Sequence, residues 1–135
     1  MARLGGIGDG AIGCAVGIAL ALLGPHQAHA HARLVRAQPS DHAQLSQAPA
    51  HIELWFNELL DDGFNTIAVF PAAELNTART DRVSGSPTLD AQDRTHLTVA
   101  VQPLPPGEYV VEWWVLSRDG HSAPGRLRFR VSGSH

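Results

Sequence analysis

Short stretches of alternating apolar and polar residues, separated by turn-forming residues, dominate positions 31–135. In residues 51–57, Ile52, Leu54 and Phe56 fall on one face, and this period of two is typical of a half-buried β-strand. Prolines and glycines, as in residues 104–107, mark the turns between such stretches. The pattern predicts further strands at residues 31–37, 65–71, 96–101, 108–117 and 125–131.

Three stretches carry additional information about the sheet. Residues 72–92 are polar, and we expect a long connection with one weak edge strand around residues 79–83. Residues 108–117 are apolar on both faces, as in a central strand. Residues 125–131 alternate apolar residues with arginines, which predicts an edge strand protected by charge.

About seven strands with regular turn signals predict an all-β, immunoglobulin-like β-sandwich. The single cysteine, Cys14, precedes the predicted strands, so the domain has no disulfide and its core must hold by apolar packing. Trp113 and Trp114 fall on opposite faces of one strand, and we expect at least one of them in the core.

Residues 1–30 have the pattern of a secretory signal peptide. Arg3 precedes an apolar run at residues 11–24, and the small residues Ala28 and Ala30 stand before the predicted cut. The run of about 14 residues is shorter than the about 20 that a membrane-spanning helix needs. We therefore expect residues 31–135 to form one exported domain without membrane insertion, although a cut after Ala32 is an alternative.

The overall charge argues against several classes of partner. The chain has a formal net charge of −3 and contains no lysine, so it lacks the basic patch expected for nucleic acid or anionic lipid. It also lacks the G-x-S-x-G, H-E-x-x-H and glycine-rich phosphate motifs of common enzymes.

A cut after Ala30 would make His31 the first residue. Its α-amine and ring nitrogen can then chelate one metal ion, because the amine loses its proton at small cost near neutral pH. Asp119 and His121, at positions i and i+2 of an extended chain, would face a common point, although Asp119-Gly120 is also a turn signal. These nitrogen and oxygen donors suit Cu(II), whereas zinc prefers a tetrahedral set.

The other histidines are less informative. His51 and His96 alternate with apolar residues on predicted strands, so we expect both to be exposed to solvent. His42 falls in a turn-rich stretch, and His135 is the terminal residue.

Five groups of residues, in this order and spacing, resemble the CopC family of periplasmic copper-resistance proteins. They are A-H-A-H at residues 28–31, residues 34–39, residues 52–58, residues 104–113, and the ending S-x-D-G-H at residues 117–121 with Gly125 and Phe129. The resemblance implies a Greek-key β-sandwich that binds one Cu(II). It implies that His31 gives its amine and ring nitrogen, and that Asp119 and His121 give the remaining ligands.

The resemblance also implies a role in handling periplasmic copper, often beside an inner-membrane CopD-type partner. Some relatives carry a methionine-rich Cu(I) site, but the only methionine here is Met1. We expect a copper-binding protein without turnover that acts in copper homeostasis or resistance. The alternatives are a copper monooxygenase-like enzyme with an N-terminal histidine chelate, and an interaction module without metal.

Overall fold

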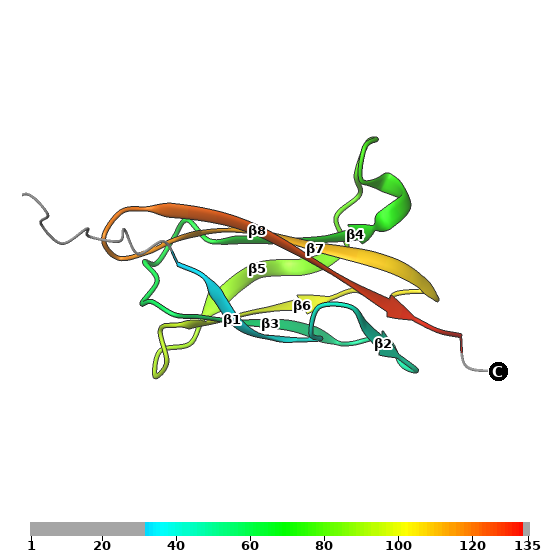
Figure 1. The fold of residues 1–135 in the computed structure, drawn as a ribbon, viewed down its shortest axis with the longest axis horizontal. Helices are drawn as coiled ribbons and strands as arrows, with labels where there is room; N and C mark the ends of the chain where they lie inside the picture. The colour runs from blue at the N-terminus through cyan, green and yellow to red at the C-terminus, as the bar shows by residue number, and fades with distance from the viewer. Residues whose placement is uncertain (1–31, 134–135) are drawn as a thin grey trace, which may run out of the picture.

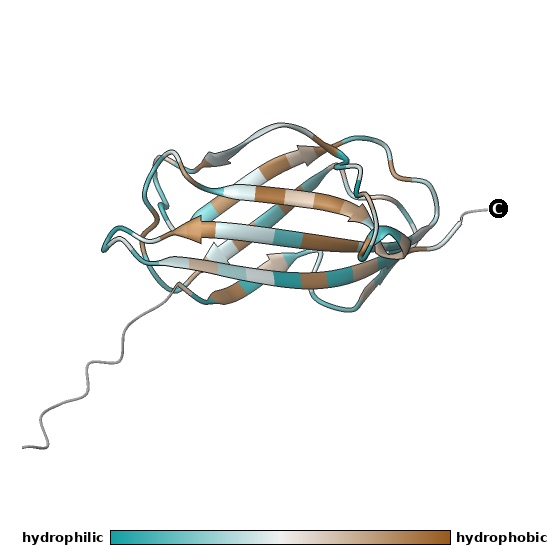
Figure 2. Ribbon diagram, turned by 90° about the horizontal axis from the view of Figure 1, so that it is seen from above, coloured by the Kyte–Doolittle hydropathy of each residue, from teal (hydrophilic) through white to brown (hydrophobic). Residues whose placement is uncertain are grey.

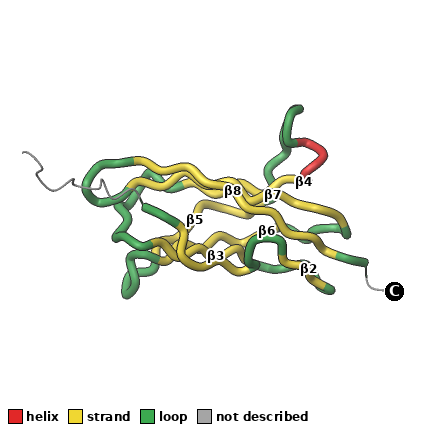
Figure 3. Tube along the Cα trace, viewed as in Figure 1, coloured by secondary structure: helices red, strands yellow, loops and turns green. Residues whose placement is uncertain are grey.

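Two four-stranded β-sheets lie face to face and enclose the core (Figures 1 and 3). The computed structural model describes residues 32–133. The strand orders are β1-β3-β6-β5 in one sheet and β2-β8-β7-β4 in the other, which confirms the predicted all-β sandwich. The elements are β1 (Leu34–Gln38), β2 (Ala43–Leu45), β3 (His51–Phe56), β4 (Thr66–Pro71), the short 3-10 helix η2 (Ala72–Glu74), β5 (Val83–Leu89), β6 (His96–Val101), β7 (Gly107–Leu116) and β8 (Ser122–Val131).

Alternating hydropathy along the strands builds the core, and Figure 2 shows this alternation as changes of colour. Ile52, Leu54 and Phe56 of β3 all point inward and are at most 2 % exposed, as their period of two predicts. Trp113 of β7 is buried while Trp114 is half exposed, so one of the paired tryptophans packs in the core.

The prediction missed or misplaced β2, β5 and the start of β1. β2 is an unpredicted strand of three residues, too short to leave a recognisable pattern. β5 covers Val83–Leu89 rather than residues 79–83. Its pattern is weak because β5 is an edge strand whose register shifts between Ser84 and Thr88, and Gly85 adopts a φ of 80° there. β1 begins at Leu34, and His31 lies outside the described residues.

β7 and β8 form the longest pairing among the described strands. β7 is the predicted central strand, with β4 on one side and β8 on the other. β8 begins at Ser122 rather than Gly125, and all ten of its residues pair with β7. The prediction that β8 is an edge strand was wrong, because β2 pairs with its last residues in parallel, from Phe129 to Val131.

Tight packing inside this pair explains why Gly125 is a glycine. Gly125 is the cross-strand partner of Trp113, and a Cβ atom at Gly125 would overlap the indole ring. Further along the pair, Tyr109 stacks on Phe129 with 5.6 Å between ring centroids, and its hydroxyl donates a hydrogen bond to the carbonyl of Pro105. These contacts fix β7 and β8 against each other on the core side of the sheet.

The polar connection after β4 covers part of the opposite face of this sheet. Phe70 and Val110 form a cross-strand pair that is fully buried outside the main core cluster. The guanidinium of Arg79 lies 4.5 Å from the centre of the Phe70 ring. The carboxylate of Asp81 accepts a hydrogen bond of 3.0 Å from the backbone N–H of Val69. The connection is therefore packed and hydrogen-bonded despite its polar sequence.

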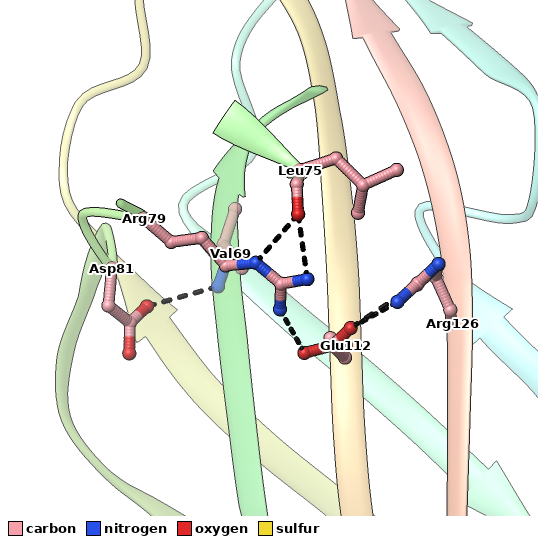
Figure 4. Close-up of polar contacts among 6 residues, drawn as sticks. All are labelled: Val69, Leu75, Arg79, Asp81, Glu112 and Arg126. Atoms are coloured by element: carbon pink, nitrogen blue, oxygen red, sulfur yellow. Dashed lines mark hydrogen bonds and ion pairs between the residues drawn. The ribbon is translucent and has the colours of Figure 1, made fainter. Parts of the chain in front are cut away.

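Glu112 joins this connection to β8 (Figure 4). Its Oε1 accepts a hydrogen bond of 2.6 Å from Arg79, whose Nε and Nη2 also donate to the carbonyl of Leu75. Its Oε2 accepts hydrogen bonds of 2.7 and 3.2 Å from Arg126 of β8. The hydrogen bonds from Arg126, together with the charge of Arg79, hold the pKa of Glu112 below its usual range.

The Trp113–Gly125 contact predicts that Gly125→Ala destabilises the fold. The added methyl group must displace the buried indole, and we expect the free energy of unfolding to fall by about 1–3 kcal/mol. Urea unfolding followed by circular dichroism measures this change. Arg130→Ala, at an exposed position of the same strand, is the control and should change the value by less than about 0.5 kcal/mol.

The ion pairs of Glu112 predict a pH-dependent contribution to stability. Because its pKa is lower in the folded protein, its stabilising contribution is present above the unfolded pKa of about 4.3 and is lost as the pH falls through the folded pKa. Glu112→Gln should therefore lower the urea midpoint at about pH 7 and have a smaller effect at about pH 3.

Asp62→Asn is the matched control, because Asp62 is 72 % exposed and its ion pair with Arg94 lies at the surface. It should have a small effect at both pH values. If Glu112→Gln lowered the urea midpoint equally at both pH values, the ion pairs of Glu112 would not be the source of pH-dependent stability.

Candidate metal centre

The loop that joins β7 to β8 carries both predicted metal ligands that the structure describes. The backbone N–H of Ser117 donates to the carbonyl of His121, and that of Gly120 donates to the carbonyl of Ser117, each at 2.9 Å. Gly120 has a φ of 92°, a left-handed conformation that favours glycine. The Asp119-Gly120 turn signal is therefore confirmed, and the turn closes the hairpin.

The same loop rests on the segment that follows β3. Ser117 forms a β-bridge with Leu60, and the N–H of Arg118 donates to the carbonyl of Leu59 at 3.0 Å. The N–H of Asp61 donates to the carbonyl of Leu116 at 2.8 Å. These hydrogen bonds hold the backbone just before Asp119 against the segment that follows β3.

The side chains of Asp119 and His121 lie together, as their spacing predicts. His121 Nδ1 is 3.2 Å from Asp119 Oδ1, and both side chains are nearly half exposed. The contact places the imidazole and the carboxylate side by side at this end of the sandwich.

Hydrogen bonds also determine the charge state of Asp119. The Ser117 hydroxyl, as the largest contributor, and then His121 hold the pKa of Asp119 below its usual range. All the hydrogen bonds that residues 32–133 donate to this carboxylate reach Oδ1. Asp119 is therefore a partly exposed carboxylate whose Oδ2 accepts no hydrogen bond from residues 32–133, so Oδ2 is a suitable oxygen donor for a cation.

The chain enters the described region beside this loop. Ala32 is 5 % exposed and belongs to the core cluster. The N–H of Arg33 donates to Asn57 Oδ1 at 2.6 Å, and Asn57 lines a hollow of about 350 Å³ together with Ser117 and Asp119. His31 itself lies outside the described residues. The residues that follow it are nevertheless anchored at the end of the sandwich that carries Asp119.

The described residues do not make a complete metal site by themselves. Within residues 32–133, no three histidine, cysteine, aspartate or glutamate side chains are grouped so that they could hold a metal ion. A metal site at Asp119 and His121 would require at least one further ligand.

Glu58 is a polar residue of this hollow that our sequence analysis did not single out as a candidate ligand. Its Oε2 is buried and has no hydrogen-bond partner among the described residues. Its signal in the sequence is a carboxylate directly after the predicted strand that ends at Asn57.

Among the histidines that the structure describes, His96 is the one whose predicted environment was wrong. Its side chain is only 16 % exposed, because it stacks on Trp55 with 4.2 Å between ring centroids and pairs with Glu53 Oε1 at 3.0 Å. The cross-strand pairing of Trp55 with His96, which sequence periodicity does not reveal, brings the two rings together. His51 is exposed as predicted, His42 is 79 % exposed beside Asp41, and His135 lies outside the described residues.

Comparisons with known proteins identify the family. The CopC domain matches residues 34–132. The chain is 34 % identical over 109 residues to copper transport protein CutJ of Bacillus subtilis, covering 79 % of this chain but only 19 % of CutJ. It is 31 % identical over 115 residues to copper resistance protein C of Xanthomonas campestris pv. juglandis, covering 82 % of this chain and 87 % of the relative.

Solved structures share the fold. CopC from Methylosinus trichosporium OB3b has a TM-score of 0.69 and 27 % identity, covering 78 % of this chain and 97 % of that chain. PcoC of Escherichia coli, described as a methionine-rich copper resistance protein, has a TM-score of 0.65 and 27 % identity, covering 76 % and 100 %. This chain differs from that description, because its only methionine is Met1.

No helix in the described part of the chain is both long and apolar enough to cross a membrane.

The match over residues 34–132, the relatives above 30 % identity and the shared sandwich agree with one another. The chain belongs to the CopC domain family, and the two relatives compared above are named as a copper transport protein and a copper resistance protein.

Proposed function

We propose that this chain is a periplasmic Cu(II)-binding protein that acts in copper homeostasis or resistance as a carrier or scavenger. The observation that carries the proposal is the contact between Asp119 and His121 at the end of the sandwich where Arg33 is anchored. The names of the copper transport and copper resistance relatives support copper as the cargo.

Signal-peptide cleavage after Ala30 would complete the ligand set. It turns the amide nitrogen of His31 into a free α-amine, which can bind the same ion as the ring nitrogen. Ala32, the residue that follows His31 in the sequence, is buried in the core. The three residues His31, Asp119 and His121 then supply three nitrogens and one oxygen.

This donor set favours Cu(II) among common metal ions. Nitrogen and oxygen ligands in a tetragonal arrangement suit Cu(II), which also has the highest affinity in the divalent series. The soft sulfur ligands that select Cu(I) are missing from residues 31–135, because Cys14 and Met1 both precede them. The bound copper is cargo in this proposal, and no residue is assigned a catalytic role.

An inner-membrane CopD-type protein is the proposed partner for this cargo. The support comes from CutJ, in which the matched region is a fifth of a longer copper transport protein. Intact mass spectrometry of the exported protein, with and without added Cu(II), tests the proposal first. A mass that begins at His31 and gains one copper supports it, and a mass that begins at Arg33 or gains no copper contradicts it.

The free amine predicts a strong effect of a single added residue. A glycine placed before His31 turns the amine into an amide, so Cu(II) affinity should fall by more than the about 10- to 100-fold that the loss of an outer-shell partner causes. Competition titration of the purified protein with a Cu(II) chelator measures the change. A glycine added after His135 is the control and should leave the affinity unchanged. Equal affinities of the two extended proteins would rule out the amine as a ligand.

The imidazole of His121 leads to a second prediction about Cu(II) affinity. His121→Ala removes a nitrogen donor and should also weaken Cu(II) binding by more than about 100-fold in the same titration. His51→Ala removes an exposed histidine on β3 and is the matched control, with the wild-type affinity expected. If both variants bind as the wild type does, His121 is not a ligand.

A further inference from the structure

Ser117 is a buried polar residue directly beside the proposed ligands. It is 1 % exposed, whereas the side chains of Asp119 and His121 are nearly half exposed. It stands immediately after β7, and its bridge to Leu60 fixes its backbone against the neighbouring segment. Among the described residues, no other polar side chain is as completely buried.

The Ser117 hydroxyl reaches two acceptors. It donates a hydrogen bond to Asp119 Oδ1, and it also lies 3.1 Å from the carbonyl oxygen of His121. A hydroxyl has one proton, and a charged carboxylate accepts it more strongly than a neutral carbonyl does. The proton therefore points to Asp119.

The turn does not need this hydroxyl in order to close. Backbone hydrogen bonds from Ser117 to His121 and from Gly120 to Ser117 already hold the loop. Asp119 does not need it as a hydrogen-bond partner either, because water reaches its exposed side chain. The hydroxyl instead restricts which way the carboxylate points.

Hydrogen bonds to one oxygen, Oδ1, fix the orientation of the carboxylate, and the imidazole Nδ1 of His121 lies 3.2 Å from the same atom. The Ser117 hydroxyl and the backbone N–H of His121, at 3.2 Å, both bind Oδ1. Rotation about the side-chain bond of Asp119 would break both hydrogen bonds. Oδ2 is thereby held on the side away from them, ready to bind a cation through one oxygen.

We propose that Ser117 is a positioning residue for Cu(II): its hydroxyl holds Asp119 Oδ1 so that Oδ2 is presented to the metal ion. This inference rests on the proposed function, because it concerns the same site. It adds a residue that touches no metal and acts only through Asp119.

The test compares Ser117→Ala with the wild type in protein that begins at His31. We expect Cu(II) affinity to fall by about 10- to 100-fold, the usual effect of losing an outer-shell partner, and the copper hyperfine splitting in the electron paramagnetic resonance spectrum to change. Ser117→Thr keeps the hydroxyl and should restore both. Ser132→Ala removes an exposed serine hydroxyl that binds the carbonyl of Leu45, and it should alter neither.

The pathway through Asp119 is tested in the Asp119→Asn background. If Ser117 acts only through the carboxylate, Ser117→Ala should change the affinity there by less than about twofold. An equal loss in both backgrounds overturns the proposal, and so does wild-type affinity of Ser117→Ala. A wild-type protein that binds no Cu(II) overturns the proposed function as well, so the two failures are distinguishable.

A measurement on the unmodified protein does not depend on how the variants fold. In a crystal structure of the copper-loaded protein, Ser117 Oγ should lie within hydrogen-bond distance of the Asp119 oxygen that does not bind copper. A hydroxyl that donates to the carbonyl of His121 instead would overturn the proposal.

Discussion

The antiparallel pairing of β7 with β8 is the interaction on which the rest of the structure depends. All ten residues of each strand take part, and the pair lies between β2 and β4 in its sheet. On the core side, Trp113 lies over Gly125 and Tyr109 stacks on Phe129. The same pairing ends in the turn that carries Asp119, so the packing of the core determines the position of the site.

Charged side chains on the outer faces of this sandwich attach neighbouring segments to the two sheets. Glu112 binds Arg79 and Arg126, and it thereby ties a polar connection to the sheet beneath it. On the other sheet, Trp55 lies between the guanidinium of Arg36 and the ring of His96. A single exposed ion pair contributes little to the stability of the fold, but these charged groups act together with backbone hydrogen bonds and ring packing. Together they fix segments that apolar residues alone would leave without partners.

The alternation of apolar residues was enough to predict the sandwich and its central strand. Inward-facing residues such as Ile52 and Leu54 carry a strong signal, because each of them is fully buried. β2 was missed because it is short and pairs with β8, a strand far along the chain. β5 was misplaced because it is an edge strand whose register with the neighbouring β6 is irregular. Strand periodicity contains no information about such partners.

The candidate site also has residues that the sequence predicted and residues that it did not. The sequence predicted that Asp119 and His121 face a common point of an extended chain. The two side chains do lie in contact, but they do so because both residues belong to one tight turn. The buried hydroxyl of Ser117 and the buried oxygen of Glu58 were not predicted as parts of the site. Their burial depends on how the loop after β7 rests on the segment after β3, which is a contact between residues distant in sequence.

The burial of Ala32 has a consequence for the order of maturation. A protease that cuts after Ala30 must bind the residues on both sides of that bond in an extended form. In the folded domain Ala32 is in the core and the N–H of Arg33 is bonded to Asn57, so neither is available to the protease. Under the proposed function, cutting at this bond would therefore precede the final packing of this end of the sandwich. The amine of His31 would exist only after the cut, so metal loading would come last, and an uncut precursor would lack this ligand.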